Sequence, residues 1–144
     1  MIGRGTGRAT ADLARYAQRE TRDAVRLVRM DTVTPDPNLV AYCGLYCGAC
    51  RAYLAGSCPG CRENTRGRWC RVRTCCISGG HATCAGCTSH LDPRHCAKFN
   101  NLISRVFGFV SRSNRAACID RIDRIGRQGF AREMAAARRQ TLPR

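Results

Sequence analysis

The sequence predicts a small metal-stabilised domain in which irregular cysteine-rich knuckles precede two to three short α-helices, with little or no β-sheet. A chain of 144 residues has room for one domain with helical flanks. Eleven of its twelve cysteines lie between Cys43 and Cys96, a stretch with few large apolar side chains. Cross-links through cysteine must therefore offset part of the chain entropy there. After residue 97 the apolar residues return to helical spacing.

Three C-x2-C pairs organise the cysteine-rich stretch: Cys47 with Cys50, Cys58 with Cys61, and Cys84 with Cys87. A two-residue gap lets both sulfurs of a tight turn reach one ion at about 2.3 Å. No export signal precedes the cysteines, so we expect a reducing compartment and bound metal rather than disulfides. The candidate metal ligands are Cys43, Cys47, Cys50, Cys58, Cys61, Cys70, Cys75, Cys76, Cys84, Cys87 and Cys96.

The three pairs predict two zinc sites of four sulfurs each. The first site combines the pairs at 47/50 and 58/61, and Cys43 either replaces Cys47 or joins another site. The second combines the pair at 84/87 with two of the thiols Cys70, Cys75, Cys76 and Cys96. A third zinc would need a shared sulfur or a histidine, either His81, His90 or His95. An iron–sulfur cluster is the alternative cofactor, because four thiolates suit it as readily as zinc.

Composition divides the chain into four segments. Residues 1–30 predict a basic amphipathic helix that starts near Thr10 and does not pack onto the core. Residues 31–38 predict a linker without helix, because Pro35 and Pro37 lie there. The cysteine-rich body covers 39–98, with one helical turn expected at 51–55. Residues 99–144 predict helices and a frayed tail.

Two apolar stripes after the cysteine-rich body are expected to be core. The first has the spacing of one helix face over residues 97–111 and consists of Phe99, Leu102, Ile103, Val106, Phe107 and Val110. The second is Ile119, Ile122 and Ile125, on a helix that Asn114 caps and Gly126 ends. A third short helix is expected from about residue 130 to 139.

The formal charge of +15 invites a nucleic-acid partner. Two zinc sites of four thiolates would each carry −2 and lower the charge by four, to about +11. The candidate nucleic-acid-binding residues are Arg62, Arg66, Arg68, Trp69, Arg71 and Arg73. The alternative is that these arginines neutralise thiolates and that Trp69 packs in the core. Lys98 is the single lysine among 25 basic residues, which weakens the charge as evidence for a binding face.

Between residues 39 and 99 the chain resembles the cysteine-rich domain of unknown function 3795 family. The matching stretches are YCGLYCGACRAYLAG (42–56), CPGCRE (58–63), WCRVRTCC (69–76), CAGC (84–87) and CAKF (96–99). The resemblance implies zinc binding and assigns no reaction. The chain departs from the family in its basic extension and at 92–95, where Asp-Pro-Arg-His replaces an aromatic-proline pair.

The sequence favours a cytoplasmic metal-binding module that meets an unidentified protein partner, with nucleic acid as another partner class. An iron–sulfur or redox protein ranks second, and an enzyme third. No catalytic residue is assigned, because Glu63 and Asp92 are the only carboxylates in the cysteine-rich body. Saturated four-thiolate zinc also leaves no open position for Lewis-acid chemistry. No stretch approaches the length of a membrane span.

Overall fold

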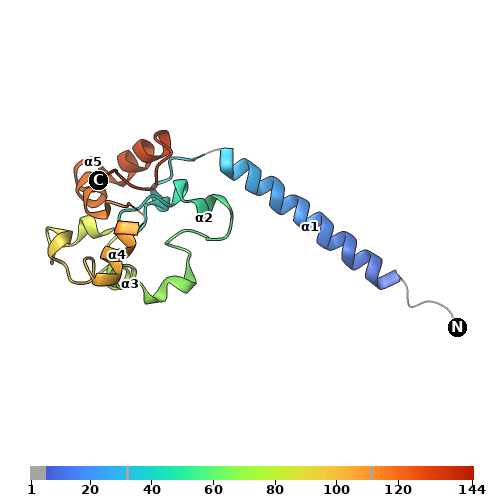
Figure 1. Cartoon of the computed structure of the whole chain (residues 1–144), viewed down its shortest axis with the longest axis horizontal. Helices are drawn as coiled ribbons and strands as arrows, with labels where there is room; N and C mark the ends of the chain where they lie inside the picture. The colour runs from blue at the N-terminus through green and yellow to red at the C-terminus, as the bar shows by residue number, and fades with distance from the viewer. Residues whose placement is uncertain (1–5, 32, 111) are drawn as a thin grey trace. The chain divides into compact units, whose positions relative to one another are not determined.

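The computed structural model describes residues 6–31, 33–110 and 112–144, which fall into two units divided after residue 32. The first unit consists of helix α1 (Thr6–Asp31), drawn in blue in Figure 1. The helix begins four residues before the Thr10 start expected from the sequence. Leu13 and Tyr16 are 69% and 65% exposed, so their side chains are not buried within this unit. The side chains of Leu27 and Val28, expected on the same face, lie outside the described residues.

The second unit, residues 33–144, is built from short helices. Its α-helices are α2 (Arg51–Leu54), α3 (Arg71–Ser78), α4 (Leu102–Val110) and α5 (Arg115–Ala136). The described part of the unit also has five 3-10 turns. Before α2 lie η1 (Pro37–Leu39) and η2 (Cys47–Ala49), and between α2 and α4 lie η3 (Thr65–Trp69), η4 (Cys84–Gly86) and η5 (Pro93–His95). The described residues form no β-strand, only an isolated antiparallel bridge between Val40 and Tyr46. The expectation of a small helical fold with little sheet is confirmed.

Two local predictions were incomplete. The linker was expected to exclude helix, but Pro37 opens a 3-10 turn that Asp36 caps by accepting a hydrogen bond from the Asn38 amide (2.8 Å). Proline is tolerated at the first position of a helix, where its missing N–H has no partner to lose. Helix α3 was also not predicted. It forms because Val72 and Cys76, four residues apart, bury the same face.

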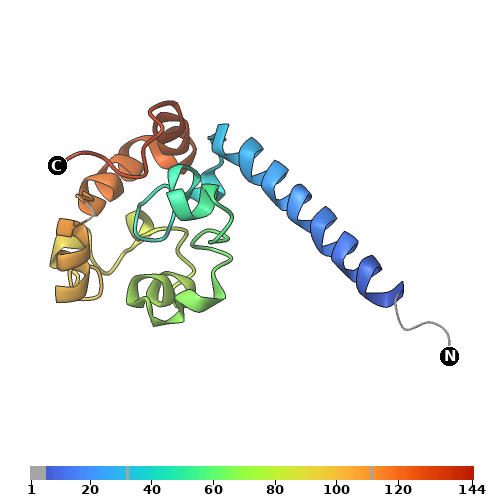
Figure 2. The ribbon, with the colours of Figure 1, turned by 45° about the vertical axis from the view of Figure 1, so that its right-hand side comes forward.

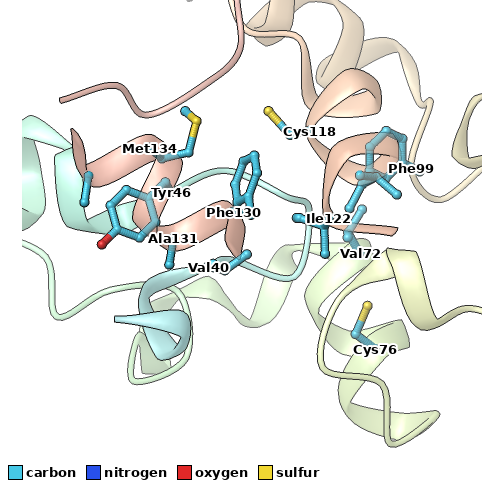
Figure 3. Packing of buried hydrophobic residues seen from close by; sticks show 12 residues of the cluster. Val40, Tyr46, Val72, Cys76, Phe99, Cys118, Ile122, Phe130, Ala131 and Met134 are labelled. Atoms are coloured by element: carbon cyan, nitrogen blue, oxygen red, sulfur yellow. The ribbon is translucent and has the colours of Figure 1, made fainter. Parts of the chain in front are cut away.

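The core lies where α5 packs on the cysteine-rich turns, as Figure 3 shows. Phe130, Ala131 and Met134 of α5 are buried together with Val40 and Tyr46 from the start of the unit. The Tyr46 hydroxyl donates to the Thr34 carbonyl and accepts from the Asp36 amide (3.3 Å). The ring therefore fills the core while its polar end is hydrogen-bonded.

Helix α5 has a break at Gly126, where φ is +72°. Figure 2 shows the orange and dark red halves as separate coils. Asn114 caps the first half by accepting from the Ala117 amide (3.2 Å), as its sequence predicted. Glycine at 126 was expected to end the helix, and a residue without Cβ adopts positive φ readily. The chain turns helical again directly and continues to Ala136, three residues short of the expected end.

The end of the chain is hydrogen-bonded rather than frayed. The Tyr46 amide donates to the Gln140 carbonyl (2.8 Å), and the Asn114 amide donates to the Thr141 hydroxyl (3.0 Å). The Leu142 amide donates to the buried sulfur of Cys118 (3.4 Å). These bonds fix residues 140–142 against both ends of the core, so the expectation of a frayed tail was wrong for this segment.

The expectation that the α4 stripe is core was also wrong for three of its members. Phe99 is buried, but Leu102, Val106 and Val110 are 74%, 56% and 77% exposed. The side chains of Ile103 and Phe107 lie outside the described residues. The second stripe is core as expected at Ile119 and Ile122, with Ile125 partly buried against it. No helix in the described ranges combines the length and apolarity needed to cross a membrane.

Candidate metal centre

Two of the three C-x2-C pairs enclose a tight 3-10 turn. In each, the amide of the second cysteine donates to the carbonyl of the first: Cys50 to Cys47 (2.9 Å) and Cys87 to Cys84 (3.1 Å). Cys70 and Cys96 likewise follow the turns η3 and η5 and donate back to the residue three before. Backbone geometry thus places four cysteines at the carboxyl ends of four separate turns.

One group of thiols gathers around Cys43 at the beginning of the unit. Burial, together with the charges of Cys61 and Cys70, raises the pKa of Cys43 to about 11. Burial raises the pKa of Cys47 to about 12, again with contributions from Cys61, Cys43 and Cys50. Each of these thiols therefore lies within electrostatic reach of several others. Cys70, which the sequence offered to the second site, is among the thiols whose charge raises the pKa of Cys43, and the charge of Cys43 in turn helps to raise the pKa of Cys84.

A second group of thiols lines one cavity of about 870 Å³, whose walls come from α3 and from other residues between 68 and 99. The lining cysteines are Cys75, Cys76, Cys84, Cys87 and Cys96, and the cavity also contains His81, His90 and His95. The three histidines named as alternative ligands thus share one cavity with five of the candidate thiols. The Lys98 ammonium group lies 3.4 Å from the Cys75 sulfur and adds a positive charge to this cavity. This contact was not predicted from the sequence.

Within this cavity the sulfurs of Cys76 and Cys84 lie 3.7 Å apart. The shared hydrogen bond lowers the pKa of Cys76, and it raises the pKa of Cys84, as expected if Cys84 donates. The position of Cys84 is fixed by its amide, which donates to the Tyr42 carbonyl (2.9 Å). The side chain of Cys76 is buried in the hydrophobic core cluster.

The donors suit zinc in kind, but the described side chains do not complete a coordination sphere. Among them no three Cys, His, Asp or Glu side chains converge closely enough to hold one ion. Two thiolates bound to one tetrahedral zinc lie about 3.8 Å apart, which the Cys76–Cys84 pair matches. All twelve cysteines are free thiols, so none is withdrawn from metal binding by a disulfide. Cys76 and Cys84 are therefore a pair of thiols at the spacing that zinc ligands adopt, and further thiols line the same cavity.

Cys118 is separate from both groups. It is fully buried, and its sulfur accepts from the Leu142 amide and contacts the Thr141 hydroxyl at 3.6 Å. Figure 3 shows its sulfur well apart from that of Cys76. Its surroundings are those of a core residue, and the sequence did not name it as a ligand.

The six residues named for nucleic acid divide into two kinds. Arg62 donates to the carbonyls of Asn38 (3.0 Å), Ala82 (2.9 Å) and Val40 (3.5 Å), and its guanidinium lies over the Tyr42 ring. Arg73 donates to the carbonyls of Cys61 (3.0 Å) and Arg62 (3.1 Å). Arg62 and Arg73 therefore hold cysteine-bearing loops together.

The other four residues, Arg66, Arg68, Trp69 and Arg71, are exposed. Trp69 is 78% exposed, so the alternative that it packs in the core is wrong. An exposed indole between arginines is a surface on which a base or another planar group can stack.

Comparison of the chain with protein-family models, curated proteins and solved structures gives no match. The family resemblance of residues 39–99 accordingly stays a prediction, and the functional argument depends on the site itself.

Proposed function

We propose that this chain is a zinc protein in which cysteine thiolates hold structural ions and the folded module serves to bind a partner. The observation that carries the proposal is the cavity lined by five cysteines, two of which, Cys76 and Cys84, already have the sulfur spacing of zinc ligands. Cys87 and Cys96 are candidates to complete a four-thiolate set, because both end 3-10 turns and line this cavity.

The small core supports a need for metal. Between Cys43 and Cys96 the buried hydrophobic core includes only the side chains of Tyr46, Val72 and Cys76. Segments with so little buried apolar area are usually held by disulfides or metals. Since the cysteines are free thiols, metal is the cross-link that remains.

A zinc ion with four thiolates supplies a cross-link and leaves no position for a substrate. The residues that would hold a first ion are in the group around Cys43, with Cys47, Cys61 and Cys70 in electrostatic contact with it. Arg62 and Arg73 brace the loops that carry these thiols, and their charges offset part of the negative charge of a thiolate site. This arrangement favours a structural role over catalysis.

The test is the metal content of protein purified without oxygen. Zinc, iron and acid-labile sulfide should be measured per chain for the native protein and for Cys84→Ser. The proposal predicts about two zinc ions, no sulfide, and the loss of about one zinc in the variant. Iron with an equal amount of sulfide would instead support the iron–sulfur alternative.

The exposure of Trp69 favours a second candidate role, binding of single-stranded nucleic acid. Arg66, Arg68 and Arg71 are exposed beside it. Base stacking on an aromatic is worth about 1–3 kcal/mol. Binding of a labelled oligonucleotide that falls steeply with salt and weakens in Trp69→Ala would support this role; salt-independent binding would refute it.

A further inference from the structure

Helix α4 exposes an apolar face that the rest of its unit does not cover. Leu102, Val106, Phe109 and Val110 are between 56% and 77% exposed. Their spacing of four, three and one residues places them on one side of the helix. Single exposed apolar residues are ordinary, but four large ones on one helix face mark a surface that another molecule covers.

The same helix forms one wall of a groove of about 600 Å³. Leu102, Val106 and Phe109 line the groove together with buried Phe99, which gives it an apolar wall and floor. Gly108 contributes to the groove because it has no side chain, and a Cβ there would lie 3.6 Å from the Ser113 carbonyl oxygen.

The charged residues that line the groove are all basic. They are Arg94, Arg105, Arg115 and Arg144, and among the residues that the structure describes no Asp or Glu side chain lines the groove with them. Arg115 lies over the Phe99 ring at 4.7 Å and Arg144 over the Phe109 ring at 5.8 Å. Arg94 is paired with Asp92 (3.2 Å) and Asp120 (2.8 Å), and the Arg115 guanidinium donates to the Phe99 carbonyl (3.0 Å). The positive charge that the groove offers to a partner therefore comes chiefly from Arg105 and Arg144. Stacking holds the two cations directly beside the apolar wall.

We propose that this groove docks an acidic amphipathic segment of a partner protein, with a large apolar side chain in the groove and carboxylates against the arginines. Helix-in-groove binding of this kind uses apolar anchors spaced along one helix face. A second copy of this chain fits poorly, because the groove and the chain, at +15, are both basic. A flat lipid surface cannot enter a groove, and a nucleic acid would leave the aliphatic wall without a stacking partner. This inference names the partner class for the interaction role proposed above and rests on that role.

The experiment uses the full chain and a fluorescent synthetic peptide of about 15 residues, with leucine at helical anchor positions and glutamate between them. A second peptide has glutamine in place of every glutamate. Two variants alter the groove: Leu102→Ser at its wall and Arg105→Glu at its rim. Two matched controls alter exposed residues elsewhere, Leu91→Ser (96% exposed) and Arg132→Glu. Zinc is measured on every sample, so failure of the metal proposal is seen separately from failure of this one.

The proposal predicts that the glutamate peptide binds and that each groove variant weakens binding at least about tenfold, while both controls bind as the native chain does. The glutamine peptide should bind at least about tenfold more weakly, and added salt should reduce the difference. Equal binding of the two peptides, or equal loss in the controls, would overturn it. Preferential binding of anionic vesicles or of an oligonucleotide, lost in the groove variants, would also overturn it in favour of that partner.

Discussion

The Cys76 sulfur lies 3.7 Å from the Cys84 sulfur, although helix α3 ends and a turn intervenes between them. This is close to the separation of about 3.8 Å that two thiolates adopt on one tetrahedral zinc. Cys76 belongs to a helix packed in the core, and Cys84 is fixed by its amide bond to Tyr42. The fold therefore brings two thiols from separate elements to the spacing of zinc ligands.

Replacing Cys84 by serine should lower the bound zinc by about one ion per chain, because the pair loses a thiolate ligand. The matched control is Cys118→Ser, which changes a thiol of the core that lies outside both cysteine groups. Its zinc content should equal that of the native protein. Loss of zinc in the control and not in the Cys84 variant would contradict the assignment.

Zinc should be released as the pH falls. Burial raises the pKa of Cys43 to about 11 and of Cys47 to about 12, above the ordinary pKa of a thiol, so binding at neutral pH displaces protons from these thiols. Protons compete better at low pH, and apparent affinity should fall about tenfold per pH unit for each proton displaced. A chromophoric chelator added between about pH 8 and about pH 5 measures the release. Retention that does not change with pH would argue against thiolate ligands.

Gly48→Ala should destabilise the fold. A Cβ at this position would lie 2.6 Å from the Cζ and hydroxyl oxygen of Tyr46, whose ring is fully buried and hydrogen-bonded. Neither atom can move without displacing the core, so we expect a loss of about 1–3 kcal/mol in the free energy of unfolding. Thermal unfolding followed by circular dichroism measures it.

The matched glycine control is Gly56→Ser, in the next turn of the chain, where no atom lies within 4 Å of the added Cβ. Its positive φ of +71° adds a backbone cost of about 1–2 kcal/mol but no steric clash. The zinc content of Gly48→Ala is the more specific readout. It should fall together with stability, because Gly48 lies inside the turn between Cys47 and Cys50. Unchanged stability and zinc would contradict the packing described here.

Arg62→Lys should cost about 1–3 kcal/mol in stability although it preserves the charge. A lysine ammonium cannot reach the Asn38 and Ala82 carbonyls together in the geometry that the guanidinium uses, and it loses the planar contact with Tyr42. Arg66→Lys, at an exposed position, should change stability by less than about 0.5 kcal/mol. Equal effects of the two substitutions in chemical denaturation would show that Arg62 is not a brace.

Local patterns in the sequence predicted the elements whose signals are local. The Asn114 cap, the interruption at Gly126 and the buried Ile119 and Ile122 follow from residue type and helical spacing. The exposed face of α4 could not be predicted in the same way. Periodicity identifies an apolar face but does not say whether a neighbour within the chain covers it.

The candidate site was predictable in composition and not in grouping. C-x2-C spacing identifies donors, whereas the partner of each pair depends on how turns pack in three dimensions. Cys70 ends η3 and lies electrostatically near Cys43, while Cys76 on α3 meets Cys84. The roles of Arg62 and Arg73 as braces had no sequence signal, because their acceptors are backbone carbonyls distant along the chain.

The most direct test of the central claim is zinc, iron and labile sulfide per chain, measured with an absorption spectrum on protein purified without oxygen. The account predicts about two zinc ions, no sulfide and no absorption near about 400 nm. Protein that folds, binds its partner and contains neither metal would contradict the claim that the thiols are ligands. Iron with matching sulfide would contradict the claim that the metal is zinc.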